Sequence, residues 1–381
     1  MNKIQLFFQE VYLRFMYLIR DRKRKSVYFC SFKGQYSDSP RAISEAIHEL
    51  DSSIKLVWRL KDGIAAPDYV ERVSGKHDSK KAQVQADAWV LTSPAPKKGN
   101  YKGSGTYYVE TWHGDRCFKR IAWAAEETMG GGYRGHEELP DMRDVNLYTA
   151  ASEYGVMQAR EGLHYYGEIQ IQGLPRNDKL VNIEEYHEYA KRIRQELHID
   201  NGEKILLYAP TFRDNLKELQ ETKVDLLSVV KILESKGEQW VCLVRAHSAS
   251  KGLDISNNSK IVDVTRFGDM ADLLLVSDCL ITDYSGCAGD FLLTGRPCVL
   301  VHFDRKEYEN NSRTLWFNPD DSGFLIAKNQ QELNEIMSNL NSYDHKSIDK
   351  KVLEFYKTTE TGNSSYITAK RIIEWINNHH K

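Results

Sequence analysis

The sequence predicts an α/β protein made of two parallel-sheet domains. Three observations support this: the chain has 381 residues, short apolar runs alternate with polar or helical stretches in both halves, and a charged helical segment separates the halves. A chain of this length exceeds one ordinary hydrophobic core and suits two domains of roughly 150 to 200 residues each. Strands that alternate with helices favour parallel sheets, because the helices serve as crossover connections.

The expected strands form two sets of short apolar or β-branched runs. The first set is 26–31, 54–58, 88–91, 107–111 and 147–150, and the second is 205–208, 240–244, 260–264, 279–282 and 298–301. The charged helical segment 182–203 lies between them, so we expect one domain over 26–185 and a second over 186–381. The amphipathic pattern at 367–376 predicts a last helix, which we expect to pack on the first domain.

Residues 1–25 differ from the rest of the chain. Apolar residues recur there at three- and four-residue intervals, which predicts an amphipathic helix: Ile4, Phe8, Val11, Phe15, Leu18 and Ile19. Lys3, Arg14 and Arg20 flank this face, and a basic run follows at 22–25. We interpret the segment as an interfacial membrane anchor for anionic lipid. The alternative is a helix that packs on the protein's own core.

Composition narrows the class of protein. A hydrophobic content of 41% and a charged content of 28% fit a folded enzyme, and a formal net charge of -2 argues against general nucleic-acid binding. The six cysteines form no CxxC pair, so we expect reduced, mostly buried thiols. No apolar run reaches 18 residues and no secretory signal pattern is found, which predicts a peripheral protein on the cytoplasmic face of the cell membrane.

The segment 280–290 (LITDYSGCAGD) is the most informative motif. An apolar strand ends there, Asp283, Tyr284, Ser285 and Gly286 form a polar turn, and a helix is expected to follow. In an open parallel sheet, ligands bind outside the carboxyl ends of the strands, where a helix N-terminus offers N–H donors to phosphate. The motif therefore predicts a pyrophosphate cradle. The alternative is an ordinary strand-to-helix turn capped by Asp or Ser.

A second motif, 111–120 (TWHGDRCFKR), also follows an expected strand. Trp112 and His113 precede Gly114, which allows a tight turn close to a ligand. A histidine at a strand end can accept the proton of an attacking hydroxyl near neutral pH. Arg116, with Lys119 and Arg120, is a candidate phosphate contact. The alternative is a hydrogen-bonded structural histidine.

Two further strand ends carry polar residues. The segment 208–214 (YAPTFRD) presents Thr211, Arg213 and Asp214, and 244–248 (VRAHS) presents Arg245 and His247. Four polar clusters at the ends of strands from both halves predict a single site between the two domains.

The chain resembles the CDP-glycerol glycerophosphotransferase family, the primases and polymerases of wall teichoic acid synthesis. The resemblance rests on six ordered motifs: 31–40 (SFKGQYSDSP), 111–114 (TWHG), 173–178 (GLPRND), 208–214, 245–247 and 280–285. It implies the GT-B fold, in which two Rossmann-like parallel-sheet domains face a cleft that binds the donor. It also implies that His113 is the general base and that His247 contacts the donor phosphate.

The resemblance assigns further residues to the cleft. It implies that Arg213, Asp283, Tyr284 and Ser285 line the donor phosphates and that Arg245 is chiefly structural. Ser37 and Asp38 are expected to form a turn and cap before a helix that begins near Pro40, and Gly34 lets that loop reach the cleft. The sequence departs from the family pattern after Ser285, where Gly286, Cys287 and Ala288 replace the usual second serine, and at 115–117. These departures leave donor and acceptor open.

The implied reaction transfers glycerol phosphate from CDP-glycerol to a hydroxyl of an undecaprenyl-type, lipid-linked saccharide and releases CMP. No carboxylate cluster suggests Mg²⁺, so we expect no metal and no cofactor. Alternatives are the same chemistry with CDP-ribitol or another CDP-alditol, a GT-B glycosyltransferase that uses a sugar nucleotide, and a non-catalytic membrane-binding module. The expected partners are the CDP-alditol, the lipid-linked acceptor and an anionic membrane surface, without nucleic acid.

Overall fold

The computed structural model describes residues 3–32, 34–95, 100–129, 139–211, 224–246, 259–311 and 314–379. Contacts divide the chain into two compact units. Unit 1 comprises residues 1–115, 135–178 and 359–381, and unit 2 comprises residues 116–134 and 179–358. The division falls within the short helix α6 (Asp178–Val181). Residues 116–134 thus group with unit 2, although they precede the predicted boundary at 185/186.

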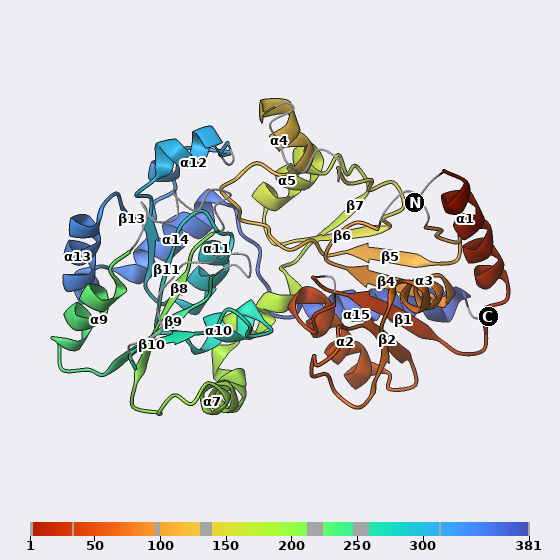
Figure 1. Ribbon diagram of the computed structural model, residues 1–381, viewed down its shortest axis with the longest axis horizontal. Helices are drawn as coiled ribbons and strands as arrows, with labels where there is room; N and C mark the ends of the chain where they lie inside the picture. Colours follow the sequence, from red (N-terminus) through yellow and green to blue (C-terminus); the bar gives the residue numbers. More distant parts are fainter. Residues whose placement is uncertain are drawn as a thin grey trace. The chain divides into compact units, whose positions relative to one another are not determined.

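Unit 1 contains a seven-stranded parallel sheet in the order β3-β2-β1-β4-β5-β6-β7 (Figure 1). Its strands are β1 (Ser26–Cys30), β2 (Lys55–Arg59), β3 (Val70–Val73), β4 (Ala88–Leu91), β5 (Tyr107–Glu110), β6 (Leu147–Ala150) and β7 (Glu168–Ile171). Its helices are α1 (Lys3–Leu18), α2 (Asp38–Leu50), α3 (Lys76–Gln85), α5 (Glu153–Gly162), the 3-10 turn η3 (Pro175–Asn177) and α15 (Ser364–His379).

Helices cover both faces of the unit 1 sheet. Ile43 and Ile47 of α2 pack with Ile372 and Ile376 of α15 against apolar side chains of the central strands. On the other face, the side chain of Trp89 in β4 donates a hydrogen bond to a carbonyl of α3. The C-terminal helix α15 therefore closes the core of the unit that contains the N-terminus.

Unit 2 repeats this architecture with a six-stranded parallel sheet in the order β10-β9-β8-β11-β12-β13. Its strands are β8 (Lys204–Ala209), β9 (Trp240–Val244), β10 (Ile261–Asp263), β11 (Cys279–Thr282), β12 (Cys298–Val301) and β13 (Leu325–Ala327). Its helices are α4 (Ala122–Met129), α7 (His187–Glu196), α9 (Leu226–Glu234), α10 (Met270–Val276), α11 (Cys287–Phe291), α12 (Arg305–Asn311), α13 (Gln330–Ser338) and α14 (His345–Phe355). Four 3-10 turns complete it: η4 (Ile183–Tyr186), η5 (Leu292–Thr294), η6 (Pro319–Asp321) and η7 (Leu340–Ser342).

The prediction of two Rossmann-like parallel-sheet domains is confirmed. In each sheet the strand order reverses beside the first strand, between β1 and β4 in unit 1 and between β8 and β11 in unit 2. Such a reversal is a topological switch point, where loops at the carboxyl ends of the strands diverge and leave room for a ligand.

The N-terminal helix has two different faces. Leu13, Met16 and Tyr17 are buried, and the Tyr17 hydroxyl accepts a hydrogen bond from the Gly105 N–H (3.0 Å). The opposite face exposes large apolar side chains: Ile4, Phe7, Phe8, Val11, Phe15 and Leu18. One face of α1 therefore packs on unit 1, and the predicted apolar stripe is in solvent.

The six cysteines all lie in the described residues and form no disulfide, and apart from half-buried Cys30 they are buried. Burial raises the pKa of the Cys287 thiol to about 11, so it is protonated at neutral pH. None of the helices in the described ranges is long and apolar enough to cross a membrane.

Candidate active site

The switch point of unit 1 is bridged by a hydrogen bond between two loops. Phe32 follows β1 and donates its N–H to Thr92 Oγ1, which follows β4 (3.2 Å). Phe32 has φ = 40°, in the left-handed region that a bulky residue rarely adopts, and its ring lies 5.9 Å from the ring of His113. Three neighbouring strand ends, those of β1, β4 and β5, therefore meet around one histidine.

The imidazole of His113 is oriented by a backbone carbonyl. Its Nδ1 lies 2.9 Å from the Thr92 oxygen, and a carbonyl oxygen only accepts, so Nδ1 carries the proton. In the neutral ring the lone pair is then on Nε2. The side chain is exposed, and the Trp112 ring stacks on it with 4.2 Å between centroids. This is the tautomer and setting that a general base requires.

A buried glutamate holds the backbone that leads to His113. Glu110 is fully buried, and its carboxylate oxygens accept hydrogen bonds from the Trp112 N–H (3.0 Å) and the Tyr108 hydroxyl (2.7 Å). Burial raises the pKa of Glu110 to about 8. Trp112 has φ = 50°, and this strained turn, followed by Gly114, aims His113 outward.

The loop after β1 is anchored by a buried ion pair. The Arg176 guanidinium of η3 donates to the Asp38 carboxylate at 3.2 and 3.3 Å. Asp38 (φ = 63°) is the first residue of α2 and Ser37 is its N-cap, so the helix begins two residues before the predicted Pro40. Gly34 (φ = 123°) accepts a hydrogen bond at its carbonyl from the Lys61 N–H. Ser37 and Asp38 are buried, and they shape the loop.

Asp115 and Arg116, which follow His113 and Gly114, make buried structural contacts. Asp115 accepts hydrogen bonds from the Ala151 N–H (2.9 Å) and the Ser152 hydroxyl (2.5 Å) within unit 1. Arg116 is fully buried in unit 2, where its guanidinium pairs with Asp290 at 2.7 Å. The departure at 115–117 from the family pattern thus supplies structural contacts in each unit.

The switch point of unit 2 is bridged by Asp283. Its carboxylate accepts hydrogen bonds from the Thr211 N–H (2.9 Å), the Thr211 hydroxyl (2.5 Å) and the Tyr284 N–H (2.6 Å). Asp283 is buried. A charged carboxylate with several donors is a strong clamp, so it fixes the loop after β8 against the turn after β11.

Tyr284 lies behind this turn. Its side chain is fully buried, it stacks on His302 and Tyr308 with centroids 4.5 and 4.0 Å away, and its hydroxyl donates to Asp304 (3.2 Å). The ring supports the turn from below. His302 and Asp304 follow β12, and sequence reasoning missed them because no motif marks them.

Ser285 and Gly286 form the outer part of the turn. Both are half-buried, and the Cys287 N–H, at the start of α11, points to Ser285 Oγ at 3.4 Å. A Cβ on Gly286 would lie 2.9 Å from Cys117 Sγ, so a larger residue there would displace the thiol. The glycine that replaces the family's second serine therefore has a packing reason.

Arg245 supports the same edge of the unit 2 sheet. Its guanidinium donates to the Phe267 carbonyl (2.8 Å), and burial lowers its pKa from the ordinary value. Arg213, Asp214 and His247 lie outside the described residues. Within the described ranges, no group of three or more His, Cys, Asp or Glu side chains could hold a metal ion.

Comparison with known proteins relates the chain, including both switch points, to one family. The family model CDP-Glycerol:Poly(glycerophosphate) glycerophosphotransferase matches residues 12–374. A teichoic acid poly(glycerol phosphate) polymerase of Staphylococcus epidermidis is 32% identical over 78% of this chain and 43% of its own length. A teichoic acid glycerol-phosphate transferase of Staphylococcus aureus is 26% identical over 96% of this chain and 97% of its own. The chain thus spans less than half of the polymerase and nearly all of the transferase.

The fold has a solved counterpart. A structure of a variant of the wall teichoic acid polymerase TagF superposes with a TM-score of 0.79 at 25% identity, over 99% of both chains. The match agrees with the GT-B fold that the motifs implied. Because the family model covers nearly the whole chain, this protein belongs to the CDP-glycerol:poly(glycerophosphate) glycerophosphotransferase family, which is a family of enzymes.

Proposed function

We propose that the protein transfers glycerol phosphate from CDP-glycerol to a hydroxyl of a polyprenyl-pyrophosphate-linked saccharide, in the synthesis of teichoic acid or a related cell-envelope polymer. The observation that carries this proposal is the arrangement of His113. Its Nδ1 proton is held by a carbonyl, so Nε2 has the lone pair that removes the acceptor's proton.

The reaction follows from these parts. The acceptor oxygen attacks the glycerol-bearing phosphorus, His113 takes the hydroxyl proton, and the bond to the bridging oxygen breaks, so CMP leaves with that oxygen. Donor phosphates belong to the turn at Ser285, which the Asp283 clamp holds. Arg213 and His247 supply further charge, as the family resemblance implies. Such transfers depend mainly on alignment and on stabilisation of negative charge.

The choice of CDP-glycerol rests on the relatives. Glycerol-phosphate enzymes match at 32% and 26% identity over most of the chain, and a TagF variant structure was determined with CDPG. A teichoic acid ribitol-phosphate polymerase of Staphylococcus aureus is 25% identical over 65% of the chain. CDP-ribitol is therefore the second candidate donor.

A panel of donors tests the proposal. The purified chain is incubated with CDP-glycerol, CDP-ribitol or UDP-sugars and a lipid-linked disaccharide, and the acceptor is weighed by mass spectrometry. We expect added glycerol phosphate units and an equal amount of CMP. Preferential addition of ribitol phosphate, or release of a nucleoside diphosphate, would contradict it.

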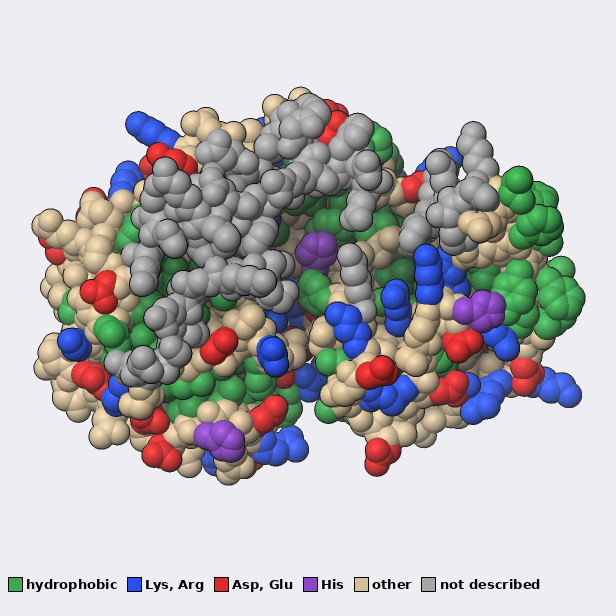
Figure 2. Space-filling view, viewed as in Figure 1, with side chains coloured by type: hydrophobic (Ala, Val, Ile, Leu, Met, Phe, Trp, Pro, Cys, Tyr) green, Lys and Arg blue, Asp and Glu red, His purple; other side chains and the backbone are tan. Residues whose placement is uncertain are grey.

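We also propose that α1 attaches the enzyme to the membrane. Ile4, Phe8 and Leu18 are 67%, 64% and 69% exposed, and a basic run at 22–25 follows the helix. Figure 2 shows hydrophobic side chains gathered over α1 with Lys and Arg side chains beside them. Apolar insertion and attraction to anionic headgroups act together in such helices.

Point substitutions test the membrane contact better than deletion, because Leu13, Met16 and Tyr17 belong to the core of unit 1. We expect the triple variant Ile4→Ser, Phe8→Ser, Phe15→Ser to lose sedimentation with anionic liposomes. Leu227→Ser, an exposed leucine of unit 2, is the control and should bind normally. Raised salt should weaken binding of the native chain only in part, because screening leaves apolar insertion intact. Normal binding by the triple variant would refute the assignment.

A further inference from the structure

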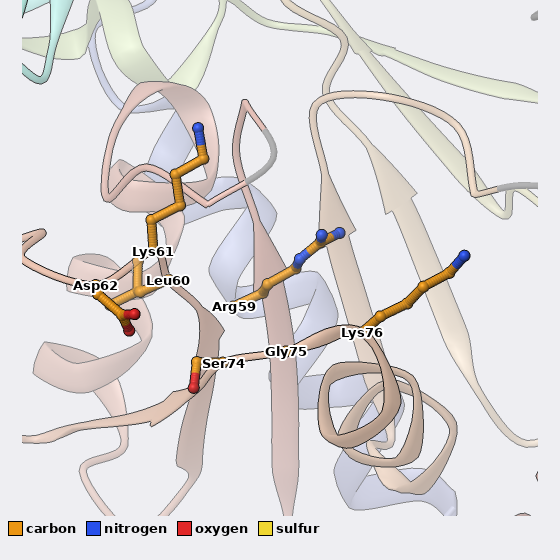
Figure 3. Close-up of a pocket in the computed structure, with 7 residues that line it drawn as sticks. All are labelled: Arg59, Leu60, Lys61, Asp62, Ser74, Gly75 and Lys76. Atoms are coloured by element: carbon orange, nitrogen blue, oxygen red, sulfur yellow. The ribbon is translucent and has the colours of Figure 1, made fainter.

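Unit 1 contains a basic cavity that the reaction described above does not use. It has a volume of about 350 Å³ and lies at the ends of β2 and β3, beside the start of α3 (Figure 3). Arg59, Lys61 and Lys76 line it, together with one carboxylate, Asp62. Figure 3 shows the Asp62 carboxylate pointing away from the ends of the three cationic side chains. The cavity therefore offers an anion several positive charges.

The backbone beside the cavity is open to a ligand. Gly75 caps α3 with φ = 74°, and a Cβ built there would meet nothing within 4 Å. The first N–H groups of this ten-residue helix follow it, and they add positive potential to that of the side chains.

The cavity lies on the same sheet edge as His113. The strands run β2, β1, β4, β5 in this order, and His113 follows β5. Neighbouring strands are about 4.8 Å apart, so three steps place the cavity roughly 14 Å from the base. The intervening loop is in contact with it, because the Lys61 N–H donates to the Gly34 carbonyl (3.0 Å).

The cavity also adjoins the helix proposed to enter the membrane surface. His77 follows Lys76, its ring stacks on Tyr12 of α1 with 5.2 Å between centroids, and the Tyr12 hydroxyl lies 3.3 Å from His77 Nε2. A ligand anchored in lipid could therefore place its charged group here while its polar end extends along the sheet edge.

We propose that this cavity binds the pyrophosphate through which the acceptor saccharide is joined to its lipid, and so sets the distance between lipid and attacking hydroxyl. The inference rests on the proposed function, which supplies the acceptor. Lysine and arginine side chains beside a helix start suit phosphate oxygens. The proposed donor site is in unit 2, so the two anions do not compete for these groups.

The test is the double variant Lys61→Gln, Lys76→Gln, with Lys81→Gln as the control. Lys81 is exposed on the same helix and does not line the cavity. Binding is measured by calorimetry with a short-chain prenyl-pyrophosphate disaccharide and with the methyl glycoside of the same disaccharide. We expect the double variant to lose at least about tenfold in affinity for the pyrophosphate compound. Affinity for the glycoside and for CDP-glycerol should be unchanged.

Three results would overturn the proposal. They are unchanged affinity for the pyrophosphate compound in a folded double variant, an equal loss for the glycoside, and an equal loss in Lys81→Gln. Loss of sedimentation with phosphatidylglycerol vesicles, while the pyrophosphate compound still binds, would instead make this a headgroup site and refute the acceptor assignment. Calorimetry measures binding without turnover, so the two proposals can fail separately. If the double variant selectively loses affinity for the pyrophosphate compound while the native chain transfers no glycerol phosphate, the cavity assignment is supported and the proposed function is refuted.

Discussion

The two switch points have the same topology, but the one in unit 1 presents an exposed histidine and the one in unit 2 contains a buried aspartate. In unit 1 the Phe32 N–H donates to the Thr92 hydroxyl between the loops, the Thr92 carbonyl accepts from His113, and the site presents an exposed imidazole. In unit 2 the carboxylate of Asp283 accepts hydrogen bonds from the Thr211 N–H, the Thr211 hydroxyl and the Tyr284 N–H. Asp283 is the charged residue of the turn 283–286, and it is buried. This difference supports the proposal that unit 1 supplies the proton acceptor and unit 2 a rigid frame for the donor.

Backbone strain follows the same division. Phe32, Asp38 and Trp112 of unit 1 have positive φ at the loops around His113. The turn at 283–286 has no such residue. Strained positions of this kind cost about 1–3 kcal/mol each and persist where packing enforces them, often at functional sites. Here Glu110 and Arg176 enforce two of the three.

The largest expected effect is on the chemical step. His113→Ala should lower turnover by about 10²–10⁴-fold, since the general base is lost, while affinity for CDP-glycerol stays within about twofold. Turnover is followed by CMP release and affinity by calorimetry. His187→Ala, an exposed histidine of unit 2, is the control. Turnover near the native value in a folded His113→Ala protein would show that His113 of unit 1 is not the general base.

The unit 2 clamp should affect the donor instead. Asp283→Ala removes the acceptor of three hydrogen bonds, so we expect at least about a tenfold loss of affinity for CDP-glycerol. Thr92→Val removes the corresponding bond of unit 1 but keeps the carbonyl that orients His113. It should leave donor affinity unchanged. Equal losses in both variants would erase the distinction between the switch points.

Glycine-to-alanine substitutions compare how tightly the two units are packed, through their effect on the free energy of unfolding. A Cβ on Gly155 would lie 1.8 Å from Asp115 Oδ2, and a Cβ on Gly289 would lie 2.6 Å from Arg116 Cβ. Gly155→Ala should destabilise unit 1 and Gly289→Ala unit 2, each by about 1–3 kcal/mol in urea unfolding. Gly202→Ala, with nothing within 4 Å, should change little. A neutral Gly155→Ala would show that Asp115 is not fixed as described.

The smallest effect concerns pH. The pKa of buried Glu110 is raised to about 8, above the ordinary 4.5, so the folded state binds its proton more tightly. This contribution to stability is fully present below pH 4.5 and is lost as pH rises towards 8. The stability of Glu110→Gln relative to the native chain, measured by thermal unfolding, should therefore be higher at pH 8.5 than at pH 5. Glu161→Gln, an exposed residue, should show no such gain. The same gain in both variants would contradict the assignment.

Sequence patterns predicted the central strands and missed three at the edges. Strands β3, β7 and β13 lie at the ends of their sheets. Exposed polar residues interrupt the apolar pattern of β3 and β7, and β13 has only three residues, which is too short a run to distinguish a strand from a loop. The charged helix after 182 was foreseen, but the pairing of 116–134 with unit 2 was not. That pairing includes the buried contact between Arg116 and Asp290 and the backbone hydrogen bonds of Phe118 and Arg120 with Trp316 and Thr314, and these residues are far apart in sequence.

The candidate site was predicted in part. Its motifs selected His113, Thr211, Asp283 and Ser285 as candidates, and the structure places each of them just after a strand of its sheet, because the carboxyl ends of parallel strands lie at one edge. The motifs did not reveal that Tyr284 and Arg116 are buried, since burial depends on Asp304, His302 and Asp290. Glu110 was read as part of a strand. Its placement directly before a histidine motif, at the end of an apolar run, is the signal that could have marked it.

The most direct test follows the phosphorus atoms of the donor. CDP-glycerol labelled with ³³P at the glycerol-bearing phosphorus is incubated with the protein and the lipid-linked disaccharide, and the products are separated. If the acceptor oxygen attacks that phosphorus, all transferred label is found in the acceptor and the released CMP is unlabelled. Label that remains with the nucleotide, as in transfer of the bare alditol or in a glycosyl transfer, would contradict the account.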